Sequence, residues 1–173
     1  MATPYRDPAE RSGYLRYFYR RWRPTRFGRI WSKAWAWIIG LGMGPGILLT
    51  LQVKDRSGDR LHATVLVVAT YQGQRYLVSM LGEGSEWVRN VRAAQGRAFI
   101  KRGRSHPVIL AELPVQERAA ILKAWCQVAT SGRQHLPVSY EAPISAFEPI
   151  ASDYPVFRID PAQRERTADR GQD

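Results

Sequence analysis

Short runs in which apolar and polar residues alternate occur along most of the chain after residue 46, and this period of two predicts β-strands. Glycine, proline, serine and aspartate separate the runs, as in strands joined by tight turns. Hairpin turns are expected at Ser57-Gly58 and at Gly103, and Pro107 requires an edge position or a bulge in its strand. The predicted strands are residues 47–54, 61–71, 75–80, 97–103, 105–113 and 154–160.

The period changes to that of a helix in some of the spaces between these strands. Residues 85–94 predict a short helix that Ser85 can cap, and residues 113–130 predict an amphipathic helix with Pro114 in its first turn. The aromatic and basic residues 13–40 predict one helix, or two that are divided at Pro24. Strands joined mostly by hairpins, with helices between them, predict a mainly β fold: an antiparallel barrel with an N-terminal helix and helical decoration.

The length of 173 residues fits one domain with one core. We expect a basic, aromatic helical segment over residues 1–44, the barrel domain over 45–160 and a disordered polar tail over 161–173. Residues 34–51 carry no charge, but four glycines and a proline interrupt them at 40–46. Two elements are therefore expected there, not one membrane span, and no signal peptide is expected.

The net charge of +11 is concentrated at the start of the chain. Residues 1–33 hold nine Lys or Arg and two acids, which leaves a net of +7. This charge fits an anionic partner: a membrane surface, a phosphorylated cofactor or nucleic acid. Arginines and aromatic rings interleaved over residues 13–40 suit a membrane interface, where rings lie at headgroup level. The alternative is a helix packed on the barrel, with its arginine stems along the surface.

The sequence lacks the residues that a disulfide, a metal site or a common catalytic motif would require. Cys126 is the single cysteine, which excludes an internal disulfide and a cysteine-built metal site. His62, His106 and His135 are scattered, so no metal is expected. Glycine-rich nucleotide-binding motifs and the nucleophile elbow are absent. An enzyme of this kind would therefore use a bound cofactor, and a cytoplasmic location, or a peripheral one at the inner face of the membrane, is expected.

Residues 79–93 have the sequence SMLGEGSEWVRNVRA, which combines a strand end, a glycine loop and a helix start. The free amides of a helix N-terminus suit a negative or carbonyl-rich edge of a ligand. Trp87 and Asn90 share one face of this helix and offer an apolar plane and a hydrogen-bonding amide. Alternatively, Trp87 belongs to the core and Asn90 is solvated.

Residues 54–60 have the sequence KDRSGDR, and this hairpin gathers Lys54, Arg56 and Arg60 at one tight turn. Cations and turn amides together suit a phosphate or a row of carboxylates. The alternative is a solvated hairpin, in which Asp55 and Asp59 partly cancel the charge.

These segments, in this order, resemble the deazaflavin (F420)-dependent nitroreductase and quinone reductase family. The resemblance covers residues 45–112 and continues more loosely to about residue 159. LLTLQVKDRSGDR is similar to that family's strand and hairpin, and VSMLGEGSEWVRNVRA is similar to its strand, glycine loop and W-x-x-N helix. The resemblance implies a split β-barrel that binds coenzyme F420. FMN or haem, on a related split barrel, are the alternatives.

The resemblance also implies roles for single residues. In that family the hairpin cations hold the phosphate and the oligoglutamate tail of the cofactor, and Arg56 and Ser57 match those positions best, with Lys54 and Arg60 close by. The strand end and the W-x-x-N helix flank the deazaflavin ring. The residues that would border the ring are Ser79, Met80, Leu81, Gly82, Trp87 and Asn90.

The implied reaction is transfer of a hydride from reduced deazaflavin to a quinone or a nitroaromatic acceptor. Residues 13–40 would then act as a membrane dock for a lipid quinone, and split barrels often form homodimers. The rival hypothesis is a non-enzymatic basic barrel that binds a membrane surface or, less favoured, nucleic acid.

Overall fold

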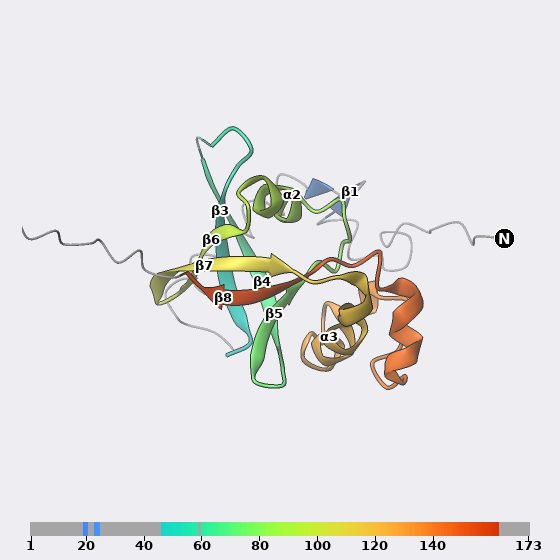
Figure 1. Ribbon diagram of the computed structural model, residues 1–173. Coiled ribbons are helices and arrows are strands. Elements are labelled where there is room, and N and C mark those ends of the chain that lie inside the picture. The colour runs from blue at the N-terminus through green and yellow to red at the C-terminus, as the bar shows by residue number, and fades with distance from the viewer. Residues whose placement is uncertain (1–18, 21–22, 25–45, 59, 163–173) are drawn as a thin grey trace, which may run out of the picture.

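A computed structural model describes residues 19–20, 23–24, 46–58 and 60–162 (Figure 1). In this part of the chain, six antiparallel strands form a closed barrel in the order β3-β4-β5-β8-β7-β6, and β6 pairs with β3 to close it. The mainly β fold with helical decoration is thus confirmed. The strands are β3 (Leu48–Lys54), β4 (Leu61–Tyr71), β5 (Gln74–Val78), β6 (Arg97–Arg102), β7 (Arg104–Glu112) and β8 (Val156–Pro161).

Antiparallel pairing sorts the connections of the barrel into two ends. Neighbouring strands alternate in direction all the way round, so β3, β5 and β7 finish at the end where β4, β8 and β6 begin. This end, called the α2 end, carries the β3–β4 hairpin, the loop after β5 and α2 (Glu86–Ala93). The opposite end, called the Gly103 end, carries the β4–β5 turn, the β6–β7 turn and the start of β3. Figure 1 shows the β3–β4 hairpin and the β4–β5 turn pointing in opposite directions.

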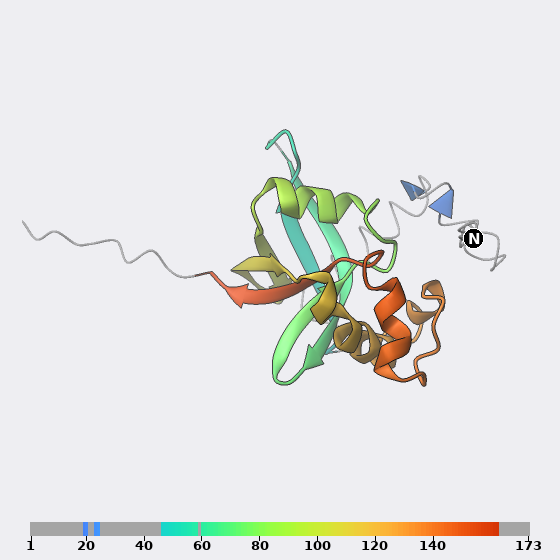
Figure 2. The ribbon, with the colours of Figure 1, turned by 45° about the vertical axis from the view of Figure 1, so that its right-hand side comes forward.

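Alternate residues of the strands fill the barrel interior, as a period of two requires. In β3, Leu49, Leu51 and Val53 are at most 4% exposed. The helix α2 lies against β3 and turns Trp87 and Val88 into the same apolar cluster (Figure 2). This helix therefore covers the interior at the α2 end.

A second apolar cluster lies outside the barrel, between α3 (Val115–Val128), β4 and β5. Two 3-10 helices, η3 (Arg133–His135) and η4 (Ile144–Ile150), complete it. Trp125 and Phe147 are among its largest buried side chains. A Cβ at position 132 would lie 2.7 Å from the Trp125 ring, so the turn after α3 requires glycine there. The cluster supports β5 up to the point where the candidate site begins.

The boundaries of the predicted elements shift by one to a few residues. The α3 helix begins after Pro114, which occupies its N-cap position. Pro107 pairs with Phe99 of β6 but precedes Val108, the first β7 residue that pairs with β8, so it occupies an edge position as expected. The strand β8 continues through Pro161, one residue into the predicted tail. Residues 163–173 lie outside the described residues.

The helix expected over residues 13–40 is not formed at the four of these residues that the structure describes. Tyr19–Arg20 (β1) and Arg23–Pro24 (β2) pair antiparallel as a two-stranded sheet. The ring of a proline disfavours the α conformation in the residue before it, which favours an extended Arg23. The rest of the segment, including most of the expected membrane dock, lies outside the described residues.

Candidate functional site

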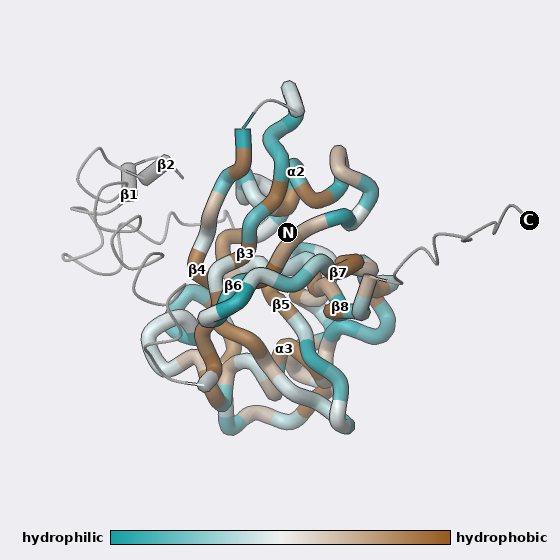
Figure 3. The backbone as a smooth tube through the Cα atoms, turned by 90° about the vertical axis from the view of Figure 1, so that its left-hand side faces the viewer, coloured by the Kyte–Doolittle hydropathy of each residue, from teal (hydrophilic) through white to brown (hydrophobic). Residues whose placement is uncertain are grey.

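The β3–β4 hairpin presents its cations to solvent at the α2 end, and Figure 3 shows its hydrophilic tip at the same end as α2. The exposed members are Lys54, Arg56, Ser57 and Arg60. The Asp55 amide donates to the Arg60 carbonyl at 2.8 Å, and the Gly58 amide donates to the Asp55 carbonyl at 3.0 Å. The Ser57 hydroxyl donates to the Asp55 carboxylate at 2.7 Å. The proton of this hydroxyl, which the sequence resemblance assigns to phosphate binding, is therefore used within the turn.

The chain turns sharply where β5 ends, and Ser79 and Gly82 fix this turn. Ser79 is 1% exposed, its amide donates to the Pro155 carbonyl at 2.9 Å, and its hydroxyl donates to the Gly82 carbonyl at 2.8 Å. Gly82 has a φ of +75°, and a Cβ there would lie 2.9 Å from the Asp153 carbonyl oxygen. Only glycine fits both the conformation and the space.

The two residues between Ser79 and Gly82 are half-buried. Met80 packs against the outer apolar cluster beside α3, close to Gly132. Its side chain therefore anchors the strand end to α3, and its expected place beside a ring stays a prediction, as does that of Leu81.

Ser85 occupies the N-cap position of α2 in an extended conformation, but its side chain does not cap the helix. Its hydroxyl oxygen lies 2.7 Å from that of Ser79. Because Ser79 donates its own proton to Gly82, Ser85 is the donor of this bond. The expected cap is therefore wrong: the Ser85 side chain is directed toward Ser79, and its oxygen accepts no hydrogen bond from the amides of the first helical turn.

Trp87 belongs to the core, as the simpler of the two sequence hypotheses expects. It is 7% exposed, and its ring lies 5.3 Å from the Phe157 ring at an interplanar angle of 60°. Such tilted aromatic pairs stabilise a core beyond the area that they bury. The indole thus fixes α2 on the barrel, and contact with a ligand ring stays a prediction.

Asn90 is not solvated, in contrast to that same hypothesis. Its side chain is 1% exposed, and its amide nitrogen Nδ2 has no hydrogen-bond partner in the described part of the chain. A buried donor without an acceptor costs roughly 1–3 kcal/mol of stability. Asn90 is therefore the predicted site residue whose hydrogen-bonding capacity is unused.

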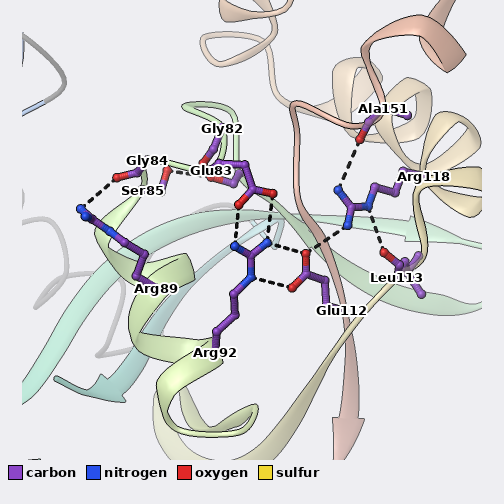
Figure 4. A network of polar contacts seen from close by, with 11 residues as sticks. Gly82, Glu83, Gly84, Ser85, Arg89, Arg92, Glu112, Leu113, Arg118 and Ala151 are labelled. Atoms are coloured by element: carbon purple, nitrogen blue, oxygen red, sulfur yellow. Dashed lines mark hydrogen bonds and ion pairs between the residues drawn. The ribbon is translucent and has the colours of Figure 1, made fainter. Parts of the chain in front are cut away.

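Charged side chains that the sequence hypotheses did not include tie the glycine loop to β7 and α3 (Figure 4). Arg92 of α2 donates to Glu83 of the loop, with Nη2–Oε1 at 3.0 Å, and to Glu112 at the end of β7, at 2.7 and 2.8 Å. The same Glu112 accepts a bond of 3.0 Å from Arg118 of α3. The network thus joins three elements at the α2 end.

Burial and charge differ along this network. Arg118 is 6% exposed, and it also donates to the carbonyls of Leu113 at 2.9 Å and Ala151 at 3.4 Å. The hydrogen bonds to Glu112 and Glu83 raise the pKa of Arg92 above its ordinary value, and the hydrogen bond from Arg92 lowers the pKa of Glu83. Arg92 and Glu83 therefore stay charged at neutral pH.

One sequence signal could have found part of this network. In the helix 115–128, position 118 shares a face with Leu122 and Trp125, which are both buried. A cation on an apolar helix face requires a buried partner, because an unpaired buried charge is strongly unfavourable. No comparable signal marks Glu83 or Glu112, whose partners are distant in sequence.

The described residues also show whether a metal site or a membrane-spanning helix is present among them. No group of His, Cys, Asp or Glu in them could hold a metal ion. None of the helices described has both the length and the apolar composition to cross a membrane.

No family model matches the chain, and no curated protein matches it. Among solved structures, it is similar to an F420-H2 dependent reductase (18% identity, 66% of this chain and 95% of the other, TM-score 0.42). It is also similar to a candidate 5-nitroimidazole antibiotic resistance protein from Bacteroides thetaiotaomicron (11%, 76% and 80%, 0.48). A third is a heme binding protein from Mycobacterium smegmatis (15%, 79% and 51%, 0.46).

The group of proteins that the sequence resembles is thus represented among these structures. At these identities and TM-scores, the likenesses carry no argument about what this chain binds, and the expected homodimer stays a prediction. The case for a function therefore depends on the residues of the α2 end.

Proposed function

We propose that the protein is an F420-dependent oxidoreductase that binds its cofactor at the α2 end. The observation that carries this proposal is the strand order, which brings the 54–60 hairpin, the strand end at Ser79 and the W-x-x-N helix to one end of the barrel. These are the segments that carry the sequence resemblance, and they are distant from one another in the chain. A placement at opposite ends would have contradicted the hypothesis.

The hairpin suits the anionic part of this cofactor. Lys54, Arg56 and Arg60 are exposed, and none of them forms an ion pair with a described residue at the hairpin. Arginine binds phosphate and carboxylate through two parallel hydrogen bonds. These three residues would hold the phosphate and the glutamates.

Asn90 suits the ring part. The ring of a deazaflavin carries carbonyl groups along one edge, and Nδ2 of Asn90 is a buried donor that lacks an acceptor. A carbonyl that reached it would offset the cost of the unpaired donor. Trp87 would contribute indirectly, by fixing α2 through its contact with Phe157.

When bound and reduced, the cofactor supplies a low-potential hydride, and a quinone or a nitroaromatic compound would accept it. The task of the protein is to bind and orient the two molecules. The bonds of Ser79 to Pro155, Gly82 and Ser85 hold the strand end rigid for this purpose.

Titration of the full-length protein with F420, FMN and haem, followed by ring absorbance and fluorescence, tests the proposal. F420 should bind, and Arg56→Gln/Arg60→Gln should raise its Kd by about tenfold or more, since two charge-assisted contacts are lost. A fragment of the cofactor without phosphate and glutamates should bind the variant and the natural chain equally.

The matched control is Lys101→Gln/Arg104→Gln, which removes the same charge at the Gly103 end and should leave the Kd for F420 unchanged. Binding of FMN or haem without binding of F420 would contradict the proposal. Oxidation of reduced F420 by a soluble quinone or nitroaromatic compound then tests the reaction itself.

A further inference from the structure

The second cationic hairpin of the barrel, at residues 101–106, lies at the end opposite the candidate site. Its sequence is KRGRSH, with three cations and no carboxylate. Arg102 and Arg104 pair across the turn at Gly103, and Lys101 pairs with Ser105. Lys101 also pairs with Thr50 near the start of β3, whereas the 54–60 hairpin follows the end of that strand. The two hairpins therefore lie at opposite ends of β3.

No described residue neutralises the charges of this hairpin. In the described residues 46–50, 71–75, 101–107 and 160–162, Asp160 is the only carboxylate, and it is bound to Arg158 at 2.8 Å. Arg102 and Arg104 are exposed, Lys101 is half-buried, and none of the three forms an ion pair with a described residue. A positive field of this kind attracts an anionic surface.

Apolar side chains accompany the cations on the outer face of the sheet. Phe99 is 42% exposed and pairs with Pro107, which is also exposed, two positions before the Lys101–Ser105 pair. At the start of β3, Ile47 is 37% exposed. Cations next to exposed rings and aliphatic groups are the composition of surfaces that bind at a lipid interface.

The chain enters the barrel at the same end. Arg102 donates to the Gly46 carbonyl at 3.0 Å, so the hairpin touches the point where residues 1–45 join the barrel. Those residues carry a net charge of +7. The basic N-terminal part of the sequence is thus joined to the barrel next to this hairpin.

We propose that the Gly103 end is a docking surface for an anionic lipid membrane, with the cations of the 101–106 hairpin against the headgroups and the α2 end directed away from the bilayer. A lipid surface is favoured over nucleic acid because Phe99 is the single exposed Phe, Tyr or Trp among the described residues beside these cations, and the other exposed apolar groups there are aliphatic. The inference does not rest on the proposed cofactor.

Vesicle binding of the full-length chain tests the proposal through two matched variants. Vesicles of phosphatidylcholine with about 30% phosphatidylglycerol are compared with vesicles of phosphatidylcholine alone. Lys101→Glu/Arg104→Glu should weaken binding to the anionic vesicles by at least about tenfold, because each basic residue near an anionic surface contributes substantially to binding. Arg56→Glu/Arg60→Glu makes the same charge change at the α2 end and should weaken it by less than about threefold.

An equal loss in both variants, or no loss in either, would overturn the proposal, because binding would then follow the net charge or the N-terminal segment alone. Tighter binding to single-stranded or duplex oligonucleotides than to vesicles, with the same dependence on Lys101 and Arg104, would overturn it in favour of nucleic acid. Binding of F420 is measured in parallel. If the protein binds anionic vesicles but not F420, this result contradicts only the proposed function.

A label at each hairpin gives a test that needs no charge change. Cys126 is fully buried, and burial raises the pKa of its thiol to about 11, so it reacts poorly with thiol reagents. An environment-sensitive dye on Ser105→Cys should shift to the blue and brighten with anionic vesicles, whereas the same dye on Ser57→Cys should not. A response at Ser57→Cys, or at neither site, would overturn the orientation.

Discussion

The two cationic hairpins of the barrel differ in what surrounds their charges. Residues 54–60 combine three cations with two carboxylates, a net of +1, and residues 101–106 combine three cations with none, a net of +3. At the α2 end, Arg92 and Arg118 are bound by Glu83 and Glu112. At the Gly103 end, Arg102 and Arg104 are exposed and Lys101 is half-buried, and none of the three has an ion pair with a described residue. At the α2 end, therefore, part of the charge stabilises the structure through ion pairs, whereas no ion pair of this kind involves the cations of the 101–106 hairpin among the described residues.

This contrast predicts that the loss of one charge from the Glu83–Arg92–Glu112–Arg118 network changes stability, whereas the loss of one charge from the 101–106 hairpin changes binding. The largest effect is expected for Glu112→Gln, because Arg118 is almost fully buried and would lose its ionic partner. We expect a loss of about 2–3 kcal/mol in the free energy of unfolding, measured with urea at pH 7.

Glu117→Gln is the control for this variant, since Glu117 is an exposed acid of α3 without an ion pair to a described residue. It should change the free energy of unfolding by less than about 0.5 kcal/mol. Equal effects of the two variants would mean that the Glu112 network adds nothing to stability.

Asn90→Leu should change stability and cofactor binding in opposite directions at the α2 end. Replacing a buried, unpartnered amide by an apolar side chain of similar volume should raise the free energy of unfolding by about 1 kcal/mol. The same change should raise the Kd for F420 by about tenfold, because the donor for the ring is lost. Thermal unfolding and the F420 titration measure the two effects.

Trp125→Phe removes the other buried donor without a partner, Nε1 of Trp125 on α3. This variant should leave the Kd for F420 unchanged, since α3 packs on the outside of the barrel. If Asn90→Leu also leaves that Kd unchanged, the unpaired amide serves no ligand.

Glu83→Gln should have a smaller effect that depends on pH. The hydrogen bond from Arg92 lowers the pKa of Glu83 in the folded protein, so the folded state binds fewer protons than the unfolded state near pH 4.5. The stabilisation is therefore present above the unfolded pKa and is lost as the pH falls through the folded one. Since Glu83 is half exposed, we expect at most about 0.5 kcal/mol at pH 7.

Urea unfolding of the natural chain and of Glu83→Gln between pH 3 and pH 7 measures this effect. The two stabilities should converge at the acid end of the range. A constant difference across the range would show that the carboxylate charge is not its source.

The sequence predicted the barrel because apolar residues recur with a period of two in its strands, as Leu49, Leu51 and Val53 do in β3, although neighbours such as Thr50 are buried as well. It did not predict η3 and η4, since 3-10 turns of three to seven residues carry no apolar period long enough to recognise. Their positions are set by contact with α3 and not by local preference.

At the candidate site, the sequence could place residues on elements but could not predict their partners. The period of a helix puts Trp87 and Asn90 on one face, and both are indeed buried. It does not show that the Ser85 side chain is directed toward Ser79, because these residues meet only through the turn at Gly82. Ion pairs between distant segments, such as Arg92 with Glu112, follow from the closure of the barrel.

The smallest effect on stability should come from Arg104→Gln at the Gly103 end. Arg104 is exposed and has no ion pair with a described residue, so the free energy of unfolding should stay within about 0.5 kcal/mol of the natural value. The loss of its charge should affect only vesicle binding. The affinity for anionic vesicles should fall and should depend less steeply on salt concentration. A vesicle titration between about 50 and 300 mM NaCl, which spans weaker and stronger screening than the physiological ionic strength of about 0.15 M, measures this slope. Arg56→Gln, which removes one exposed cation from the other hairpin, should leave the slope nearly unchanged, because its charge lies at the far end of β3.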